Sequence, residues 1–268
     1  MKKKFLIICL ILVTILFNNC KKEPVVNYSP VLNFGIYNID RNENLILDTS
    51  TNITIATNEL FSIKNLSANT TSYILDFGDG QTSIQKEPVL SYKQPGTYTL
   101  TLSAVGENGL KNSVTKKIKV LERVLKKIII NSLNWNSNLS SNLNWSNDKT
   151  ADVYVEIKSL SANQSPQFNN GDFNGETFYK TSITKNIKQN QTPIEFDVKT
   201  KKVLDMTSMV KGKYGFNLYT EDPSVKYLLL STWASGVGYN YKCNVDSNKF
   251  VVTSSFNGNS IQFIFDYE

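Results

Sequence analysis

The side chains able to do chemistry in this chain are carboxylates, hydroxyls, amides and three thiols, because none of the 268 residues is a histidine. Histidine is the commonest general base and the commonest transition-metal ligand in proteins. Its absence excludes Ser-His-Asp and Cys-His catalysis and the histidine-dependent zinc sites. Hydrolysis by two carboxylates and calcium binding stay open, since both need only the Asp and Glu side chains, which number 23.

Cys20 is the thiol whose surroundings predict a modification. Met1–Lys4 is basic, Phe5–Phe17 is an almost unbroken apolar run, and a charged segment follows the cysteine. The run is too short to cross a bilayer as a helix, so it favours a cleaved export signal. Phe17-Asn18-Asn19-Cys20 resembles the lipobox of bacterial lipoproteins, although asparagines stand where that family prefers small residues.

This resemblance implies a signal peptide at residues 1–19, a lipidated Cys20 and a polar tether at residues 20–29. Cys20 would carry a diacylglycerol and an acylated amino group, with palmitate among the expected acyl chains. Two or more chains hold a protein stably on a membrane. An ordinary secretory signal, or an uncleaved anchor with Cys20 incidental, is the alternative. We therefore expect a lipid-anchored protein of the bacterial cell envelope, with the membrane leaflet undetermined.

The remaining cysteines limit the disulfides to be expected, and the net charge limits the kinds of partner. Cys9 leaves with the signal, so Cys243 is left alone and no intramolecular disulfide is expected. We interpret Cys243 as a small buried hydrophobe rather than a reactive thiol. Loss of the three N-terminal lysines lowers the formal net charge from +6 to +3. No arginine-rich stripe is present, so nucleic acid is not an expected partner.

After the tether the chain becomes a series of short runs rich in Val, Ile, Thr, Tyr and Phe, broken by Asn, Gly, Ser and Pro. Such runs are typical of strands. Apolar and polar residues alternate in Thr97–Leu102, Val153–Ile157 and Ile261–Phe265, which predicts one buried face and one wet face. Without crossover helices, the pattern predicts an all-β fold of two consecutive antiparallel β-sandwich domains, with a boundary near Leu121–Lys126.

Two motifs identify the first of these domains. Tyr73–Gly80 contains Asp-Phe-Gly-Asp-Gly, and Tyr92–Leu102 contains a Tyr-x-x-x-Gly-Thr-Tyr strand entry. Together they resemble the polycystic kidney disease (PKD) domain, an immunoglobulin-like sandwich common on cell surfaces, with Leu75 in place of the family tryptophan. The resemblance implies a domain at residues 30–122.

Turn chemistry supports the same interpretation. Asp79-Gly80 is a turn dipeptide after an apolar strand, and Gly78 relieves crowding beside it. Asp76 and Asp79 are expected to bond to exposed backbone amides. Calcium binding or catalysis by these two aspartates is the alternative to this architectural role.

Residues 126–268 form the second domain. Its strand candidates begin near Ile128, Val153, Thr177, Ile194, Gly215, Leu228, Phe250 and Ile261. Ala151–Ile157 and Tyr214–Tyr219 resemble strands of C2-like sandwiches. The loops that bind calcium in that family would here carry Asp148, Asp152, Glu221 and Asp222. Because calcium prefers six to eight oxygen ligands, these four favour solvated loop charges, and no metal ligand is predicted.

The three tryptophans all fall in the second domain. Trp135 and Trp233 end strand patterns and are expected in the core. Trp145 stands among polar residues in an Asn/Ser-rich loop, so it is the predicted ligand-binding residue, where a ring could stack on a sugar.

These observations predict a non-enzymatic envelope protein that is a spacer and binding module for a protein or glycan partner, with no catalytic residue and no cofactor. Two alternatives stay open. One is a glycan-degrading enzyme that uses two carboxylates about 5–10 Å apart, and no such pair can be placed from the sequence. The other is a purely structural assembly lipoprotein.

Overall fold

The computed structural model of the chain is almost entirely β-structure, which confirms the predicted fold class. The residues that it describes are 29–38, 47–107, 109–136, 145–146, 148–161, 163–165, 167–169, 172–205, 208–209, 211–222, 225–232, 239–244 and 249–268. A search of these residues finds no helix long and apolar enough to cross a membrane. Cys20 lies outside the described residues, as does Trp233.

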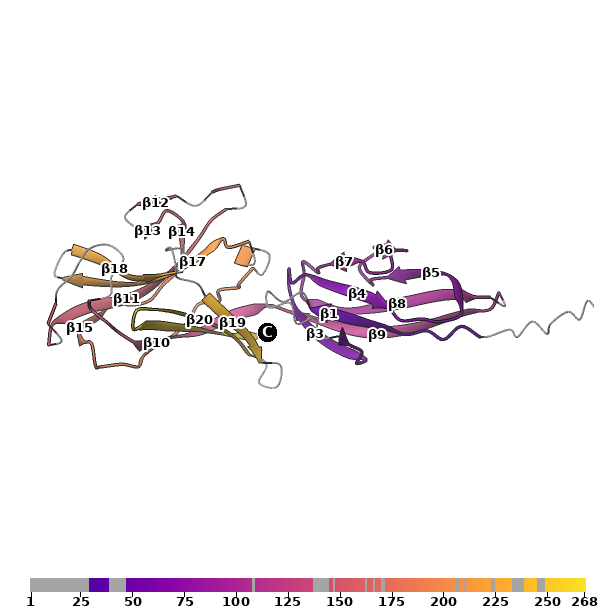
Figure 1. The fold of residues 1–268 in the computed structure, drawn as a ribbon, viewed down its shortest axis with the longest axis horizontal. Helices are drawn as coiled ribbons and strands as arrows, with labels where there is room; N and C mark the ends of the chain where they lie inside the picture. The colour runs from indigo at the N-terminus through magenta and orange to yellow at the C-terminus, as the bar shows by residue number, and fades with distance from the viewer. Residues whose placement is uncertain are drawn as a thin grey trace, which may run out of the picture.

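Strands β1–β9 form one sandwich, which we call the first sandwich (Figure 1). Their bounds are β1 Phe34–Asn38, β2 Leu47–Asp48, β3 Asn52–Ala56, β4 Phe61–Asn65, β5 Thr70–Asp76, β6 Thr82–Ser83, β7 Val89–Leu90, β8 Gly96–Gly106 and β9 Lys111–Leu121. One sheet has the order β2-β1-β4-β7 and the other β3-β9-β8-β5-β6.

One strand pair departs from the antiparallel prediction. β3 runs parallel to β9, with Ile53 opposite Ile118 and Ile55 opposite Val120. Parallel neighbours need a crossover connection, and here the chain leaves β3 for the opposite sheet before it returns to form β9. The first sandwich is therefore a mixed structure at this edge, not a purely antiparallel one.

The core of the first sandwich follows the alternation of its strands. In β8, Leu100 and Leu102 are fully buried, whereas Thr97 and Thr99 are exposed. Leu75, which stands at the position of the family tryptophan, is also fully buried and joins the same cluster. The predicted inner and outer faces of this strand are confirmed.

Strands β10–β21 form the second sandwich, shown at the left in Figure 1. Their bounds are β10 Arg123–Ser132, β11 Thr150–Ser159, β12 Phe168–Asn169, β13 Asp172–Phe173, β14 Glu176–Lys180, β15 Thr184–Lys188, β16 Ile194–Asp197, β17 Tyr214–Asp222, β18 Val225–Ser231, β19 Tyr239–Asn244, β20 Lys249–Phe256 and β21 Asn259–Tyr267. One sheet has the order β16-β10-β21-β20-β19, and the other has the order β14-β11-β17-β18 with β15 also paired to β11.

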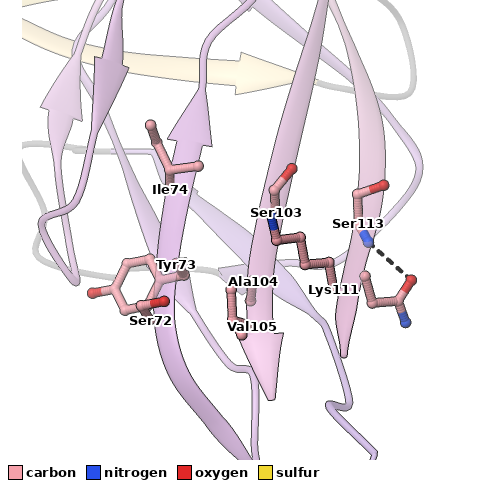
Figure 2. A pocket seen from close by; sticks show the side chains of 9 residues that line it. Ser72, Tyr73, Ile74, Ser103, Ala104, Val105, Lys111 and Ser113 are labelled. Atoms are coloured by element: carbon pink, nitrogen blue, oxygen red, sulfur yellow. Dashed lines mark hydrogen bonds between the residues drawn. The ribbon is translucent and has the colours of Figure 1, made fainter. Parts of the chain in front are cut away.

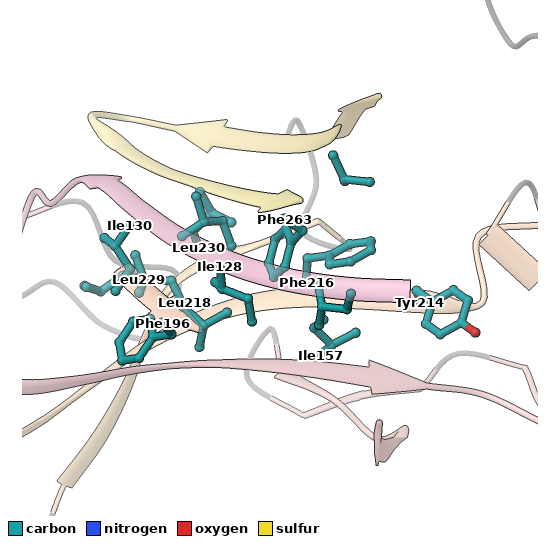
Figure 3. Packing of buried hydrophobic residues seen from close by; sticks show 14 of the residues in the cluster. Ile128, Ile130, Ile157, Phe196, Tyr214, Phe216, Leu218, Leu229, Leu230 and Phe263 are labelled. Atoms are coloured by element: carbon teal, nitrogen blue, oxygen red, sulfur yellow. The ribbon is translucent and has the colours of Figure 1, made fainter. Parts of the chain in front are cut away.

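All eight predicted strand starts of this region correspond to strands, whereas β12, β13, β15 and β19 were not predicted. Apolar side chains from both sheets meet in one core (Figure 3). The rings of Phe216 and Phe263, from opposite sheets, lie 4.6 Å apart between centroids. Trp135 is fully buried in this core, as predicted.

The alternation of apolar and polar residues in β11 led to one wrong prediction, that of a wet outer face. Val153, Val155 and Ile157 face the core as predicted, but the opposite side chains, Tyr154 and Glu156, are buried as well. Asp172 of the two-stranded β12–β13 hairpin binds side chains on this outer face. The expectation of a wet face was therefore wrong for β11.

A single residue, Glu122, separates β9 from β10. Beside it, Arg123 is almost fully buried, and its Nη2 lies 3.0 Å from Glu59 Oε2 of the first sandwich. Its guanidinium also lies over the rings of Phe250 and Tyr267. These contacts tie the two sandwiches, which lie end to end in Figure 1, to each other.

Candidate binding sites

The Asp-Phe-Gly-Asp-Gly turn has the architectural contacts that the sequence predicts. Asp76 Oδ1 accepts a hydrogen bond from the backbone N–H of Gly78 at 2.8 Å, and Asp79 Oδ1 accepts one from Gln81 at 3.0 Å. Gly78 has a φ of +74°, and a Cβ there would meet the carbonyl oxygen of Thr99 at 2.6 Å. Both carboxylates are thus engaged in holding the turn.

A tyrosine locks this turn to the core of the first sandwich. The buried hydroxyl of Tyr92 donates to the carbonyl of Phe77 at 2.7 Å, and its ring stacks on Tyr98 at 4.0 Å. Burial, followed by the charge of Asp79, raises the pKa of Tyr92. The phenol therefore stays protonated and keeps donating, which is a structural role.

The first sandwich has a shallow groove of about 570 Å³ across three strands (Figure 2). Residues 72–74 of β5, 103–105 of β8 and 111–113 of β9 line it. Its polar side-chain groups are serine hydroxyls, the phenol of Tyr73, an asparagine amide and the ammonium of Lys111, and no carboxylate lines it. It offers hydrogen bonds and one positive charge but no general acid or base from Asp or Glu, and the sequence analysis did not predict it.

Trp145, the predicted ligand-binding residue, lies at one end of the second sandwich. It is half-buried, and its ring makes edge contacts with the buried Trp135 at 6.0 Å and with the half-buried Tyr227 at 5.4 Å. Lys149 Nζ lies 5.0 Å from the centroid of the Trp145 ring, and Asp222 forms an ion pair with Lys149. The structure thus brings Trp145 together with a second aromatic ring and two opposite charges.

Two of the four acidic residues considered for calcium, Asp152 and Asp222, have other partners. Asp222 pairs with Lys149, and Asp152 Oδ1 accepts a hydrogen bond from the backbone N–H of Asn186 at 3.0 Å. Asp148 is exposed to solvent. Within the described ranges, no group of three or more Cys, Asp and Glu side chains is placed to hold a metal ion.

A second polar group, missed by the sequence analysis, lies on the outer face of β11, β17 and β18. Asp172 of the β12–β13 hairpin accepts hydrogen bonds from Lys158 at 2.8 Å and from the hydroxyl of Tyr219 at 2.5 Å. Lys226 Nζ lies 3.4 Å from its other oxygen. The ring of Tyr219 stacks on Tyr154 at 5.1 Å.

Burial, hydrogen bonds and neighbouring charges shift the pKa values of Asp172 and Tyr219. Burial alone would raise the pKa of Asp172, but the hydrogen bonds from Lys158 and Tyr219 and the charges of Lys158 and Lys226 outweigh it, so the pKa is lowered. Burial, followed by the hydrogen bond to Asp172, raises the pKa of Tyr219. Asp172 is therefore held as a carboxylate that fastens the hairpin to the sheet. The sequence signal was the pair of tyrosines, Tyr154 and Tyr219, at outward positions of two strands.

Comparison with known proteins relates the first sandwich to one family. Residues 45–120 match the family model described as PKD domain. The pre-pro-metalloprotease PrtV of Vibrio cholerae serotype O1 is 40% identical over 52 residues, which are 19% of this chain and 6% of that protein. The chain thus matches only a small part of the length of this curated relative.

Solved structures resemble this chain only with low TM-scores. The PKD1 domain of Vibrio anguillarum Epp is 28% identical and covers 35% of this chain and 95% of its own, with a TM-score of 0.26. A carbohydrate-binding module of the β-sandwich superfamily is 11% identical and covers 90% of this chain and 99% of its own, with a TM-score of 0.27. Together with the family match and the Asp-Phe-Gly-Asp-Gly turn, the immunoglobulin-like arrangement of the first sandwich leads to one conclusion: residues 45–120 are a PKD domain.

Proposed function

We propose that this protein is a non-enzymatic, lipid-anchored component of the bacterial cell envelope that binds a glycan through the second sandwich. The PKD domain acts as a spacer that presents the binding domain. A protein ligand is the alternative partner. The cluster of Trp145, Tyr227, Lys149 and Asp222 is the observation that carries the proposal.

The cluster combines two kinds of group that sugars require. The ring of Trp145 presents apolar area suited to the C–H face of a sugar, and the adjacent ammonium and carboxylate suit its hydroxyls. Lys149 lies over the Trp145 ring in the free protein, and its long, flexible side chain can give way to a ligand.

The spacer role is supported by the junction. Glu122 is the only residue between β9 and β10, and its backbone N–H and C=O both bond to Glu268 at the end of the second sandwich. The Arg123–Glu59 pair adds a buried contact across the junction. Few bonds between the sandwiches are free to rotate, so the first holds the second at a fixed distance and direction.

Calorimetry with the Trp145→Ala variant tests the binding site. A glycan and envelope-protein array first supplies a ligand for the unmodified protein. Trp145→Ala is expected to lose about 1–3 kcal/mol of binding free energy, on the scale of an interface hot spot. Trp145→Phe keeps a ring and should retain part of it, and Ile84→Ala, an exposed apolar residue of the first sandwich, is the matched control. Unaltered affinity in Trp145→Ala would refute this site, and turnover of the ligand that one Asp or Glu substitution abolishes would refute the non-enzymatic role.

Membrane fractionation of a Cys20→Ser variant tests the anchor. Without the thiol no diacylglycerol can attach, so the variant should leave the membrane fraction or accumulate as an uncleaved precursor. Metabolic labelling with a fatty acid should mark the protein that keeps Cys20 and should not mark the Cys20→Ser variant. A processed, acyl-labelled Cys20→Ser protein in the membrane fraction would contradict the lipid anchor.

A further inference from the structure

A row of polar side chains is buried on the outer face of the second sandwich. Glu156 of β11 lies opposite Asn217 of β17, which in turn lies opposite Ser231 of β18. Directly opposed side chains in antiparallel strands have Cβ atoms about 4.5–5.5 Å apart. Glu156 is 7% exposed, and Asn217 and Ser231 are fully buried. Phe216 and Leu218, on either side of Asn217, face the core, so the amide of Asn217 faces outward.

The amide of Asn217 has no hydrogen-bond partner in the protein at either its nitrogen or its oxygen. An unsatisfied buried polar atom costs about 1–3 kcal/mol, so such groups are rare unless something else binds them. Within the described part of the chain, the hydroxyl of Thr177 is the one donor to Glu156, at 2.5 Å from Oε1. A free amide therefore stands beside a carboxylate with acceptor capacity left.

The register of the sheet places this row beneath the hairpin. Lys158 lies two residues after Glu156, opposite Gly215, and Tyr219 lies two residues after Asn217, opposite Tyr154. Asp172 binds both Lys158 and Tyr219, so its carboxylate spans the row that lies between them. Successive outward residues of a strand are roughly 7 Å apart, which fits one carboxylate bridging long side chains from the flanking rows. We infer that Asp172 lies over Glu156 and Asn217 and covers them.

The charges around the row balance. Glu156, Asp172 and Glu221, which lies near the hydroxyl of Tyr154, carry negative charges. Lys158 and Lys226, which bind Asp172, and Lys180, which lies opposite Glu156, carry positive ones. A charged ligand would upset this balance in a buried place, whereas a neutral ligand would not. Asn217 needs a partner that both donates and accepts, and Glu156 needs one that donates. A hydroxyl group does both, and two adjacent hydroxyls would satisfy the two side chains together.

We propose that the outer face of β11 and β17 is a second binding site, which takes a neutral sugar residue whose adjacent hydroxyls bond to Glu156 and Asn217. Asp172 covers the site, and the ligand enters when Asp172 releases Lys158 and Tyr219. The site is separate from Trp145, which packs against the core on the other side of this sheet. It shares the ligand class of the proposed function but uses none of the same residues.

An Asn217→Leu variant of the full chain tests the proposal. Leucine has the branched shape of asparagine without its polar atoms, but it is larger, so it adds the same volume to a fully buried position in this variant and in its control. Because Asn217→Leu removes no hydrogen bond within the protein, it should lower the melting midpoint much less than the control does. The matched control is Asn259→Leu. Asn259 is equally buried, but its amide bonds to Asn134 and Leu229, so its loss should lower the melting midpoint.

The probes are free glucose, galactose, mannose and N-acetylglucosamine. At least one should raise the melting midpoint of the unmodified protein and shift its Asn217 side-chain amide resonance, which the spectrum of Asn217→Leu identifies by its absence. The rise in midpoint should vanish in Asn217→Leu and persist in Trp145→Ala. That last comparison separates this site from the Trp145 site, since either can fail alone.

Three results would overturn the proposal. The first is no response of the resonance and midpoint to any of the sugars. The second is a sugar-induced rise in midpoint that survives in Asn217→Leu. The third is a fall in the midpoint of free Asn217→Leu as large as that of Asn259→Leu, which would mean that a trapped water already satisfies the amide.

Discussion

The outer faces of the two sandwiches differ in what covers them. In the first sandwich the outward side chains of β8 and β9, such as Thr99, Lys117 and Lys119, are exposed to water. In the second, the outward Tyr154, Glu156 and Asn217 are buried. The same two-residue alternation thus produces a plain solvent surface in one domain and an additional buried layer in the other. The difference comes from the segment between β11 and β14, which contains the hairpin.

From this contrast we expect the two domains to have different roles. The first sandwich is held by a compact apolar core and a hydrogen-bonded turn, and its polar face is a surface. The second sandwich buries charged and polar groups on its outer face. Burying such groups costs free energy that apolar side chains in the same places would not cost. We therefore expect the first to behave as a scaffold and the second to contain the binding chemistry, and the following experiments probe that division.

The largest expected effect is the loss of Arg123 at the junction. Arg123→Ala leaves the carboxylate of Glu59, 17% exposed, without its buried partner, which should lower the free energy of unfolding by about 3–5 kcal/mol. Denaturant unfolding can be followed by tryptophan fluorescence, because all three tryptophans are in the second sandwich region. If the tryptophan transition stays in place, the domains are independent and the junction is not a rigid coupling.

Gly78 should matter more than Gly80 within the first sandwich. Valine at 78 combines a φ of +74° with a Cβ 2.6 Å from the carbonyl oxygen of Thr99, so Gly78→Val should cost about 3 kcal/mol. Valine at 80 has the same kind of strain but nothing within 4 Å of its Cβ, so the cost should be about 1 kcal/mol. Chemical denaturation of both variants measures this. Equal losses would show that strain alone, and not the close approach of β8, requires the glycine.

Acid should weaken the second sandwich through Asp172. Its pKa is lowered in the folded protein, so it stabilises the fold above its unfolded pKa of about 3.9 and loses that contribution as the pH falls through the folded value. Asp172→Asn should cost about 1–2 kcal/mol near neutral pH and flatten the acid limb of the stability curve. Melting curves between neutral and strongly acidic pH test this. An unchanged acid limb would mean that Asp172 does not fasten the hairpin.

The smallest effect should come from an ion pair on the surface of the first sandwich. Lys64 and Glu87 lie 3.7 Å apart with side chains 38% and 52% exposed, so Lys64→Ala should change stability by less than about 0.5 kcal/mol. Thermal melts in low and high salt give the measurement. A loss as large as that of Asp172→Asn would erase the contrast between the wet face and the covered face.

The sequence predicted the parts of this fold that depend on local pattern. Strand chemistry located all eight predicted strands of the second sandwich, and turn chemistry assigned Asp76 and Asp79 to backbone amides. It could not reveal that Asp172 reaches Lys158 and Tyr219, since that contact depends on where a short hairpin folds back. Nor could it locate the surroundings of Trp145, because Tyr227 lies on a strand distant in sequence.

The direct passage from β9 into β10 also sets how the molecule responds to tension. A pull along the long axis loads these two strands lengthwise, while their hydrogen bonds to β8 and β21 lie across the direction of the pull. Bonds arranged in this way bear a load together and do not open one after another. The junction therefore transmits a pulling force directly from one sandwich to the other. Under stretching, the first hydrogen bonds to break should lie outside the β8–β9 and β10–β21 pairs.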